Sequence, residues 1–185
     1  MIPYLGSIYT IPIYSYGVSI AIGFLLFVWL IHRDARVDTI ISRDLIDRCI
    51  LYLFIASFMG GKILWIISEW NTPALYDVPV TTFVTYSGFS ILGSVITSLL
   101  VAIICIYIHG LPLFAALDIF AQYTPLLHMW GRIGCFFAGC CYGCTTTGWL
   151  SVTYTHPEAL APLGIPLHPV QLYAALWHCV TFWIL

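Results

Sequence analysis

Charged side chains are scarce in this sequence. Only 8% of its 185 residues are Asp, Glu, Lys or Arg, whereas 61% are hydrophobic. A soluble domain of this length needs a largely polar surface, so the composition excludes a soluble globular protein. The formal net charge of −2 offers no basic surface, and we expect no nucleic-acid partner. The composition indicates a helical protein that crosses a membrane bilayer several times.

Five apolar stretches have about the length of membrane-spanning helices. They cover residues 13–31, 49–68, 89–108, 113–137 and 170–185. A helix needs about 20 predominantly apolar residues to cross a bilayer. We expect the fourth span to be broken near Pro125, since proline lacks the amide that a helix needs. The sequence predicts an all-α, polytopic membrane protein with about five spans and a single integral membrane domain over residues 1–185.

The basic residues predict how the chain is oriented. Four of the six lie in one short polar loop, residues 32–48, as Arg33, Arg36, Arg43 and Arg48. Loops rich in Lys and Arg remain in the cytoplasm, so this loop is predicted to be cytoplasmic. Counting spans from it puts the N-terminus outside. The segment 138–167 then becomes a connection at the outer face.

The other two cations, Lys62 and Arg132, lie within apolar stretches. A fixed charge is expensive in hydrocarbon, so such a cation marks a candidate functional site with an anionic partner. Gly131 and Gly134 flank Arg132 and permit close backbone approach. This favours a guanidinium that binds a phosphate or carboxylate. The alternative, for both cations, is a long side chain that extends to the headgroup layer.

Four cysteines follow Arg132 closely, namely Cys135, Cys140, Cys141 and Cys144. Three interpretations are open: apolar packing, disulfide formation at the outer face, and metal binding or redox catalysis. A zinc site would need Cys140, Cys141 and Cys144 together with His156 or His168. We expect the cysteines to be structural, with no metal site and no cofactor.

Polar side chains open the last span. His168, Gln171 and Tyr173 surround Pro169, and proline is favoured at the first position of a helix. The predicted orientation places these side chains at the outer interface, in the same layer as Arg132. A histidine there could act as a general base near neutral pH. The alternative is an interfacial helix cap.

Five segments resemble, in this order, the signature elements of the prolipoprotein diacylglyceryl transferase family. They lie at residues 15–17, 60–62, 87–94, 131–134 and 168–173. The most specific are Gly-Arg-Ile-Gly at 131–134 and His-Pro-Val-Gln-Leu-Tyr at 168–173. Leu92 stands where the family has a histidine. The cysteines follow the version of the motif found in part of the family.

The resemblance implies transfer of a diacylglyceryl group from phosphatidylglycerol to the lipobox cysteine of a prolipoprotein signal peptide. The reaction would take place at the outer face of the bacterial cytoplasmic membrane. Catalysis is assigned to Arg132, Tyr16 and His168. Substrate binding is assigned to Arg132, Lys62, Gly88, Ser90, Gly93, Gly131, Gly134, Gly143, Gln171 and Tyr173.

Two other functions are open. Leu92 suggests a lipid-binding relative without catalysis, and the outer-face cysteines suggest a membrane thiol oxidoreductase. In the family, a further span carries a second arginine and a tyrosine. The stretch 170–185 has 16 residues, fewer than the roughly 20 that cross a bilayer. We therefore expect the chain to lack the C-terminal span, to bind phosphatidylglycerol weakly and to transfer poorly.

Overall fold

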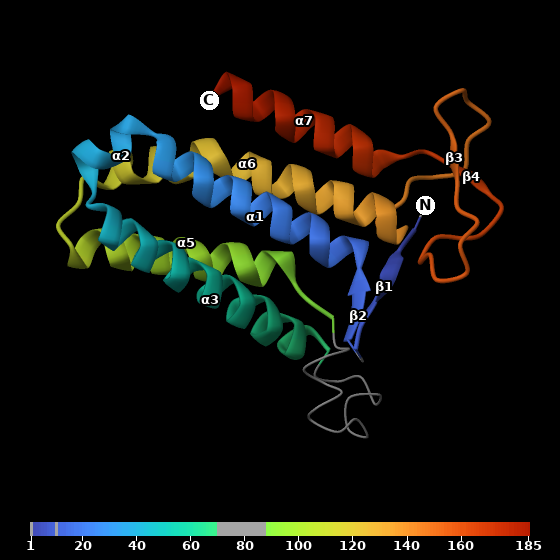
Figure 1. Ribbon diagram of the computed structural model, residues 1–185, viewed down its shortest axis with the longest axis horizontal. Helices are drawn as coiled ribbons and strands as arrows, with labels where there is room; N and C mark the ends of the chain where they lie inside the picture. Colours follow the sequence, from blue (N-terminus) through green and yellow to red (C-terminus); the bar gives the residue numbers. More distant parts are fainter. Residues whose placement is uncertain (1, 10, 70–87) are drawn as a thin grey trace. The chain divides into compact units, whose positions relative to one another are not determined.

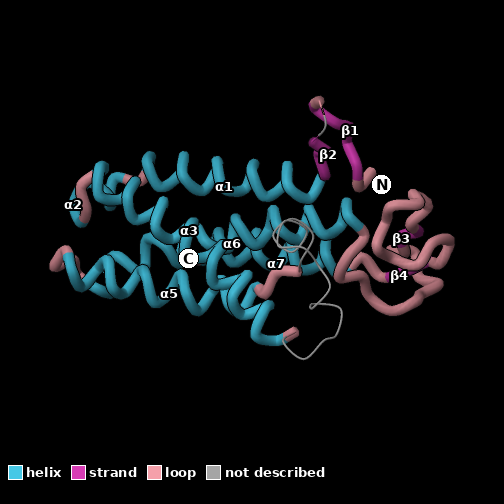
Figure 2. Tube along the Cα trace, turned by 90° about the horizontal axis from the view of Figure 1, so that it is seen from below, coloured by secondary structure: helices cyan, strands magenta, loops and turns pink. Residues whose placement is uncertain are grey.

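The computed structural model describes residues 2–9, 11–69 and 88–185, and its fold is that of an all-α membrane protein (Figure 1). The helices are α1 (Ser15–Arg33), α2 (Ala35–Ile40), α3 (Arg43–Ser68), α5 (Ile91–Ile108), α6 (Leu113–Ala138) and α7 (Val170–Ile184). The strands are β1 (Tyr4–Ile8), β2 (Ile11–Tyr14), β3 (Val152–Thr153) and β4 (Pro166–Leu167). In the described part of the chain, the strands form two small antiparallel pairs (Figure 2).

The apolar stretches correspond to helices whose ends differ from the predicted ends by a few residues. Among the described residues, α1, α3 and α5 are both long and apolar enough to cross a membrane. Helix α7 is apolar but has 15 residues, and α6 has 26 residues.

The predicted break at Pro125 is wrong, because α6 continues through it. Membrane helices tolerate proline when neighbouring groups satisfy the freed backbone carbonyl. Most of the segment between the second and third predicted spans, residues 69–88, lies outside the described residues.

The first of two compact units comprises residues 1–34 and 118–185. Helices α1 and α6 approach closely where small residues lie. A Cβ added to Gly23 of α1 would lie 2.6 Å from the Cβ of Trp130. Helix α7 contacts α6 through aromatic rings, with the His128 and His178 rings stacked at 5.3 Å. Helix α6 therefore packs against both α1 and α7 in this unit.

A hairpin of β1 and β2 precedes α1. The backbone amide and the hydroxyl of Ser15 both donate to the carbonyl of Pro3, at 2.9 and 3.0 Å, and so join the hairpin to the helix. The all-α prediction included no strand here, and the segment has no Asn-Gly or Asp-Gly turn to indicate a hairpin. The turn instead has Tyr9 in the left-handed region, at φ 56°, which a tyrosine rarely adopts.

The second compact unit comprises residues 35–117, and its core is the pair of helices α3 and α5. The hydroxyls of Ser94 and Thr97 donate to the carbonyls of Ser57 and Ala56, each at 2.8 Å. Small and hydroxyl-bearing residues let membrane helices approach closely and add interhelical hydrogen bonds. The polar stripe on α5 therefore fixes its register against α3.

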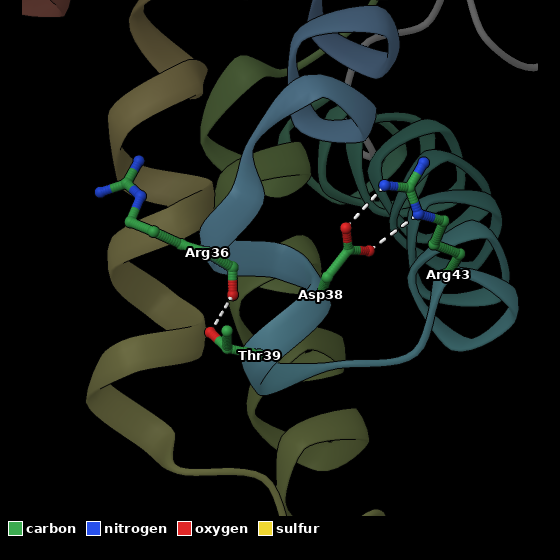
Figure 3. Close-up of polar contacts among 4 residues, drawn as sticks. All are labelled: Arg36, Asp38, Thr39 and Arg43. Carbon is green, nitrogen blue, oxygen red and sulfur yellow. Dashed lines mark hydrogen bonds and ion pairs between the residues drawn. The ribbon is translucent and has the colours of Figure 1, made fainter.

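The predicted polar loop, residues 32–48, contains helix α2 and the first turns of α3, and an ion pair joins these two helices. Arg43 donates to both carboxylate oxygens of Asp38, at 2.8 and 2.7 Å, while the Thr39 hydroxyl donates to the Arg36 carbonyl (Figure 3). The two hydrogen bonds from Arg43 hold the pKa of the Asp38 carboxyl below its usual value. The stabilisation is therefore present above the usual aspartate pKa and is lost as the pH falls through the lowered value. It is small, because both side chains are about half exposed to solvent.

We predict that Gly93→Ala destabilises the α3–α5 pair. The added Cβ would lie 2.7 Å from the Leu64 Cβ and 2.9 Å from the Gly60 carbonyl carbon, so the helices must move apart. Overpacking of this kind costs about 1–3 kcal/mol. Thermal unfolding in detergent measures the effect. Gly17→Ala is the matched control, because a Cβ there meets no atom within 4 Å. Equal melting temperatures for the two variants would contradict the close packing.

Candidate active site around Arg132

Arg132 lies in the last two turns of α6 and is half-buried. A Cβ added to the neighbouring Gly134 would lie 3.0 Å from the Tyr16 ring and 3.2 Å from the Ser19 Cβ. A Cβ added to Gly131 would make only an ordinary contact of 3.6 Å with Ile20. Gly134 is thus the glycine that lets α1 approach. The first turn of α1 brings Tyr16 to the part of α6 that carries Arg132.

The guanidinium of Arg132 has no hydrogen bond or ion pair with any of the residues that the structure describes. His128, one turn earlier on α6, stacks on His178 of α7 at 5.3 Å. Neither histidine was among the predicted site residues, although the spacing of four residues puts His128 on the same face of α6 as Arg132. A half-buried cation with no carboxylate partner is a natural binding group for an anion.

The backbone carbonyls at the end of α6 find partners in the segment that follows. The Tyr154 hydroxyl donates to the Phe136 carbonyl at 3.2 Å, and the Leu160 amide donates to the Ala138 carbonyl at 3.1 Å. The last carbonyls of any helix have no partner inside the helix. The connection between α6 and α7 therefore folds back over the helix end.

Gln171, in the first turn of α7, is 1% exposed. Its Nε2 donates to the Cys140 carbonyl at 2.8 Å and to the Tyr154 hydroxyl at 3.2 Å. Burial raises the pKa of Tyr154, so its hydroxyl stays protonated and can donate to the helix end. Gln171 Oε1 is buried without a partner among the described residues. Gln171 thus ties α7 to the end of α6, and its contact with substrate stays a prediction.

His168 and Tyr173 lie together, with the histidine Nδ1 3.2 Å from the tyrosine hydroxyl. The Gly143 amide donates to the His168 carbonyl at 3.0 Å. A Cβ on Gly143 would lie 2.9 Å from both the carbonyl oxygen and the Cβ of His168. Glycine at 143 therefore allows the segment that follows the cysteines to run against the start of α7. The catalytic role of His168 stays a prediction.

Three thiols gather after Arg132. The sulfur atoms of Cys135, Cys140 and Cys141 all lie within 4.8 Å of one another. Each is a free thiol, and Cys144 is not in this cluster. The hydrogen bond with Cys135, followed by burial, raises the pKa of the Cys140 thiol well above its usual value. The third cysteine beside Cys140 and Cys141 is therefore Cys135, whereas the zinc site considered from the sequence had Cys144 in that position.

The second unit groups four of the predicted substrate-binding residues. The Lys62 ammonium lies 3.5 Å from the Gly88 carbonyl, a long hydrogen bond. The Ser90 hydroxyl accepts from the Gly93 amide at 3.4 Å and caps α5. Leu92, at the position of the histidine in the resembling signature, is 62% exposed. Ser87, which begins this signature, lies outside the described residues.

Apolar helices of membrane-spanning length and a half-buried cation near a helix end define a polytopic membrane protein with a candidate anion site. The chain belongs to the prolipoprotein diacylglyceryl transferase family, whose model matches residues 3–185. The sequence resemblance is thereby confirmed.

Relatives from several bacteria carry matching names. The chain is 32% identical over 174 residues to phosphatidylglycerol–prolipoprotein diacylglyceryl transferase 2 of Clostridium perfringens, covering 94% of this chain and 66% of the relative. It is 31% identical over 177 residues to the transferase of Clostridium tetani, covering 96% and 70%. For the transferase of a Wolbachia from Drosophila simulans, the identity is 30%, with coverage of 95% and 65%. The chain thus spans about two thirds of the length of these relatives.

We predict that Gln171→Leu loosens the connection at the end of α6. The variant leaves the part-buried Cys140 carbonyl without its Gln171 donor, which costs about 1–3 kcal/mol. The melting temperature should fall, and limited proteolysis should cut residues 139–167 faster. Tyr173→Phe is the control, because Tyr173 is 39% exposed and lies outside the Gln171–Tyr154 network. Unchanged protease resistance in Gln171→Leu would show that the glutamine does not hold this segment.

Proposed function

We propose that this protein transfers the diacylglyceryl group of phosphatidylglycerol to the thiol of a lipoprotein-precursor cysteine. The acceptor is the lipobox cysteine of the signal peptide. Membership of the transferase family supports the reaction class. The observation that carries the proposal is Arg132, which is half-buried and has no anionic partner among the described residues. The headgroup phosphate of the lipid donor is the anion that this position fits.

The reaction demands a cation at the phosphate. The acceptor sulfur, as a thiolate, attacks the carbon of the diacylated glycerol that is esterified to the phosphate. A carbon–sulfur bond forms, the carbon–oxygen bond breaks, and the electron pair leaves with glycerol phosphate. The phosphate gains negative charge as it leaves, so a fixed guanidinium beside it stabilises the transition state more than the bound lipid.

The planar guanidinium suits this task better than an ammonium. Its paired N–H donors match two phosphate oxygens at once, whereas a lysine acts as a point charge. Gly134 lets α1 approach the same turns of α6, so Tyr16 can reach the space beside Arg132. We assign Tyr16 to orienting the lipid phosphate.

His168 is assigned to the acceptor side of the reaction. An imidazole is a common general base, and His168 is assigned to taking the thiol proton. Its Nδ1 lies 3.2 Å from the Tyr173 hydroxyl, which fixes the orientation of the ring. Lys62, with its long contact to the Gly88 carbonyl, is assigned to the lipid headgroup layer.

The arginine-rich loop supports a cytoplasmic position for residues 32–48. The N-terminus then faces outside, and Arg132 works at the outer leaflet of the bacterial cytoplasmic membrane. Signal peptides reach that leaflet after export of the precursor, so donor and acceptor meet there.

The alternative functions have less support. A thiol oxidoreductase that uses Cys140, Cys141 and Cys144 would bring these three sulfurs together, but Cys144 lies outside the thiol cluster. The relatives described above are named as transferases. A lipid-binding protein without catalysis would bind phosphatidylglycerol and form no thioether.

We predict that Arg132→Lys lowers diacylglyceryl transfer by about 10²-fold or more, since the ammonium cannot make the paired contact with the phosphate. The assay measures thioether formation on a lipobox peptide by mass spectrometry, in membranes that contain the protein. Arg132→Ala should be at least as defective. Both variants should remain in the membrane at wild-type levels.

Arg43→Lys is the matched control, because Arg43 is an exposed arginine of the polar loop, with its side chain 58% accessible. It should transfer at the wild-type rate. Wild-type turnover by Arg132→Lys would refute the phosphate-binding role. Equal losses in both arginine variants would show that the defect is not specific to this site.

A further inference from the structure

The three clustered thiols have no role in the proposed transfer. Cys135 lies in the last turn of α6, and Cys140 and Cys141 follow the helix directly. Their sulfur atoms lie within 4.8 Å of one another, and none of the three is in a disulfide. Cys135 and Cys140 are partly exposed, and Cys141 is exposed. The thiols are therefore close together and accessible from outside the protein.

The backbone is shaped to bring these sulfurs together. Gly139 ends the helix in the left-handed region, at φ 76°, and Cys141 adopts the same region at φ 56°. A side chain in that conformation costs energy, and such residues persist where the surrounding structure holds them. The Cys140 amide donates to the Cys135 carbonyl at 3.1 Å, and the Cys140 carbonyl accepts from Gln171 at 2.8 Å. Both sides of the turn are thus anchored.

The spacing of the sulfurs suits a thiolate-bound metal ion. A zinc–sulfur distance of about 2.3 Å separates two sulfurs of a tetrahedral site by about 3.8 Å. Small side-chain rotations can bring sulfurs that already lie within 4.8 Å to that separation. Three protein ligands also leave a fourth position open to water or another ligand.

The local charge suits a divalent ion. Three thiolates around a divalent cation leave one net negative charge. Arg132 precedes Cys135 by three residues on the same helix, and residues three apart are neighbours on a helix surface, so its positive charge offsets that negative charge. Soft sulfur ligands favour zinc and related thiophilic ions over magnesium or calcium.

We propose that Cys135, Cys140 and Cys141 form a binding site for one thiophilic divalent cation of the zinc class. This proposal does not depend on the transferase activity, and it replaces the sequence expectation of purely structural cysteines. The ion would bind with release of the thiol protons and would join the end of α6 to the turn that Gln171 holds.

Cobalt(II) is the probe, because its thiolate complexes absorb in the near-ultraviolet. The chain, purified in detergent under reducing and anaerobic conditions, is titrated with Co²⁺ and then with Zn²⁺. We expect one equivalent of cobalt to produce a sulfur-to-cobalt charge-transfer band, and one equivalent of zinc to remove it. Zinc should protect three further cysteines from a maleimide mass tag, beyond the buried Cys49 and Cys105.

Cys135→Ser, Cys140→Ser and Cys141→Ser should each weaken zinc binding by about tenfold or more, since each removes one of three ligands. Cys144→Ser is the matched control, because this thiol lies close in sequence but outside the cluster. It should bind zinc as the wild type does. Circular dichroism confirms that each variant is folded, and the wild-type titration is informative whatever the variants do.

Three results would overturn the proposal. The first is the absence of a charge-transfer band with stoichiometric cobalt. The second is a band that survives in folded Cys135→Ser but is lost in Cys144→Ser. The third is a disulfide among Cys135, Cys140 and Cys141, found by non-reducing mass spectrometry in protein taken directly from membranes.

Discussion

The end of helix α6 is the constraint on which the first unit depends. Its last backbone carbonyls have no partner inside the helix and need donors from elsewhere. Tyr154 and Leu160 donate to two of them, and Gln171 ties the following turn to α7. The connection must therefore fold back over the helix end. The folded connection brings His168 against Gly143, in the segment that follows the thiol cluster.

Apolar run length and the scarcity of charge predicted most of the architecture. The helices begin and end near the predicted limits, and Arg132 stands out because so few cations lie in apolar sequence. Three features could not be read from local patterns. The continuation of α6 through Pro125 depends on neighbouring groups, and the first hairpin turns at Tyr9 in an unusual conformation. The thiol cluster forms at a turn with Gly139 and Cys141 in the left-handed region, and it contains Cys135 but not Cys144.

One helix end carries two kinds of chemistry. In the two proposals, Arg132 holds the anionic headgroup and Cys135, three residues later on α6, is a soft metal ligand. A metal ion held by the cluster would stiffen the turn after α6 without taking part in the displacement at carbon. The phosphate-binding role and the metal site can therefore fail independently, because one is read from thioether formation and the other from cobalt absorption.

Headgroup release measured together with thioether formation tests the proposed transfer most directly. Membranes containing the protein would receive phosphatidylglycerol labelled in its phosphate and a peptide with one lipobox cysteine. Direct displacement at the glycerol carbon predicts labelled glycerol phosphate and diacylglyceryl peptide in equal amounts, whatever the rate. Labelled glycerol phosphate without modified peptide, or lipid binding with neither product, would contradict the transfer.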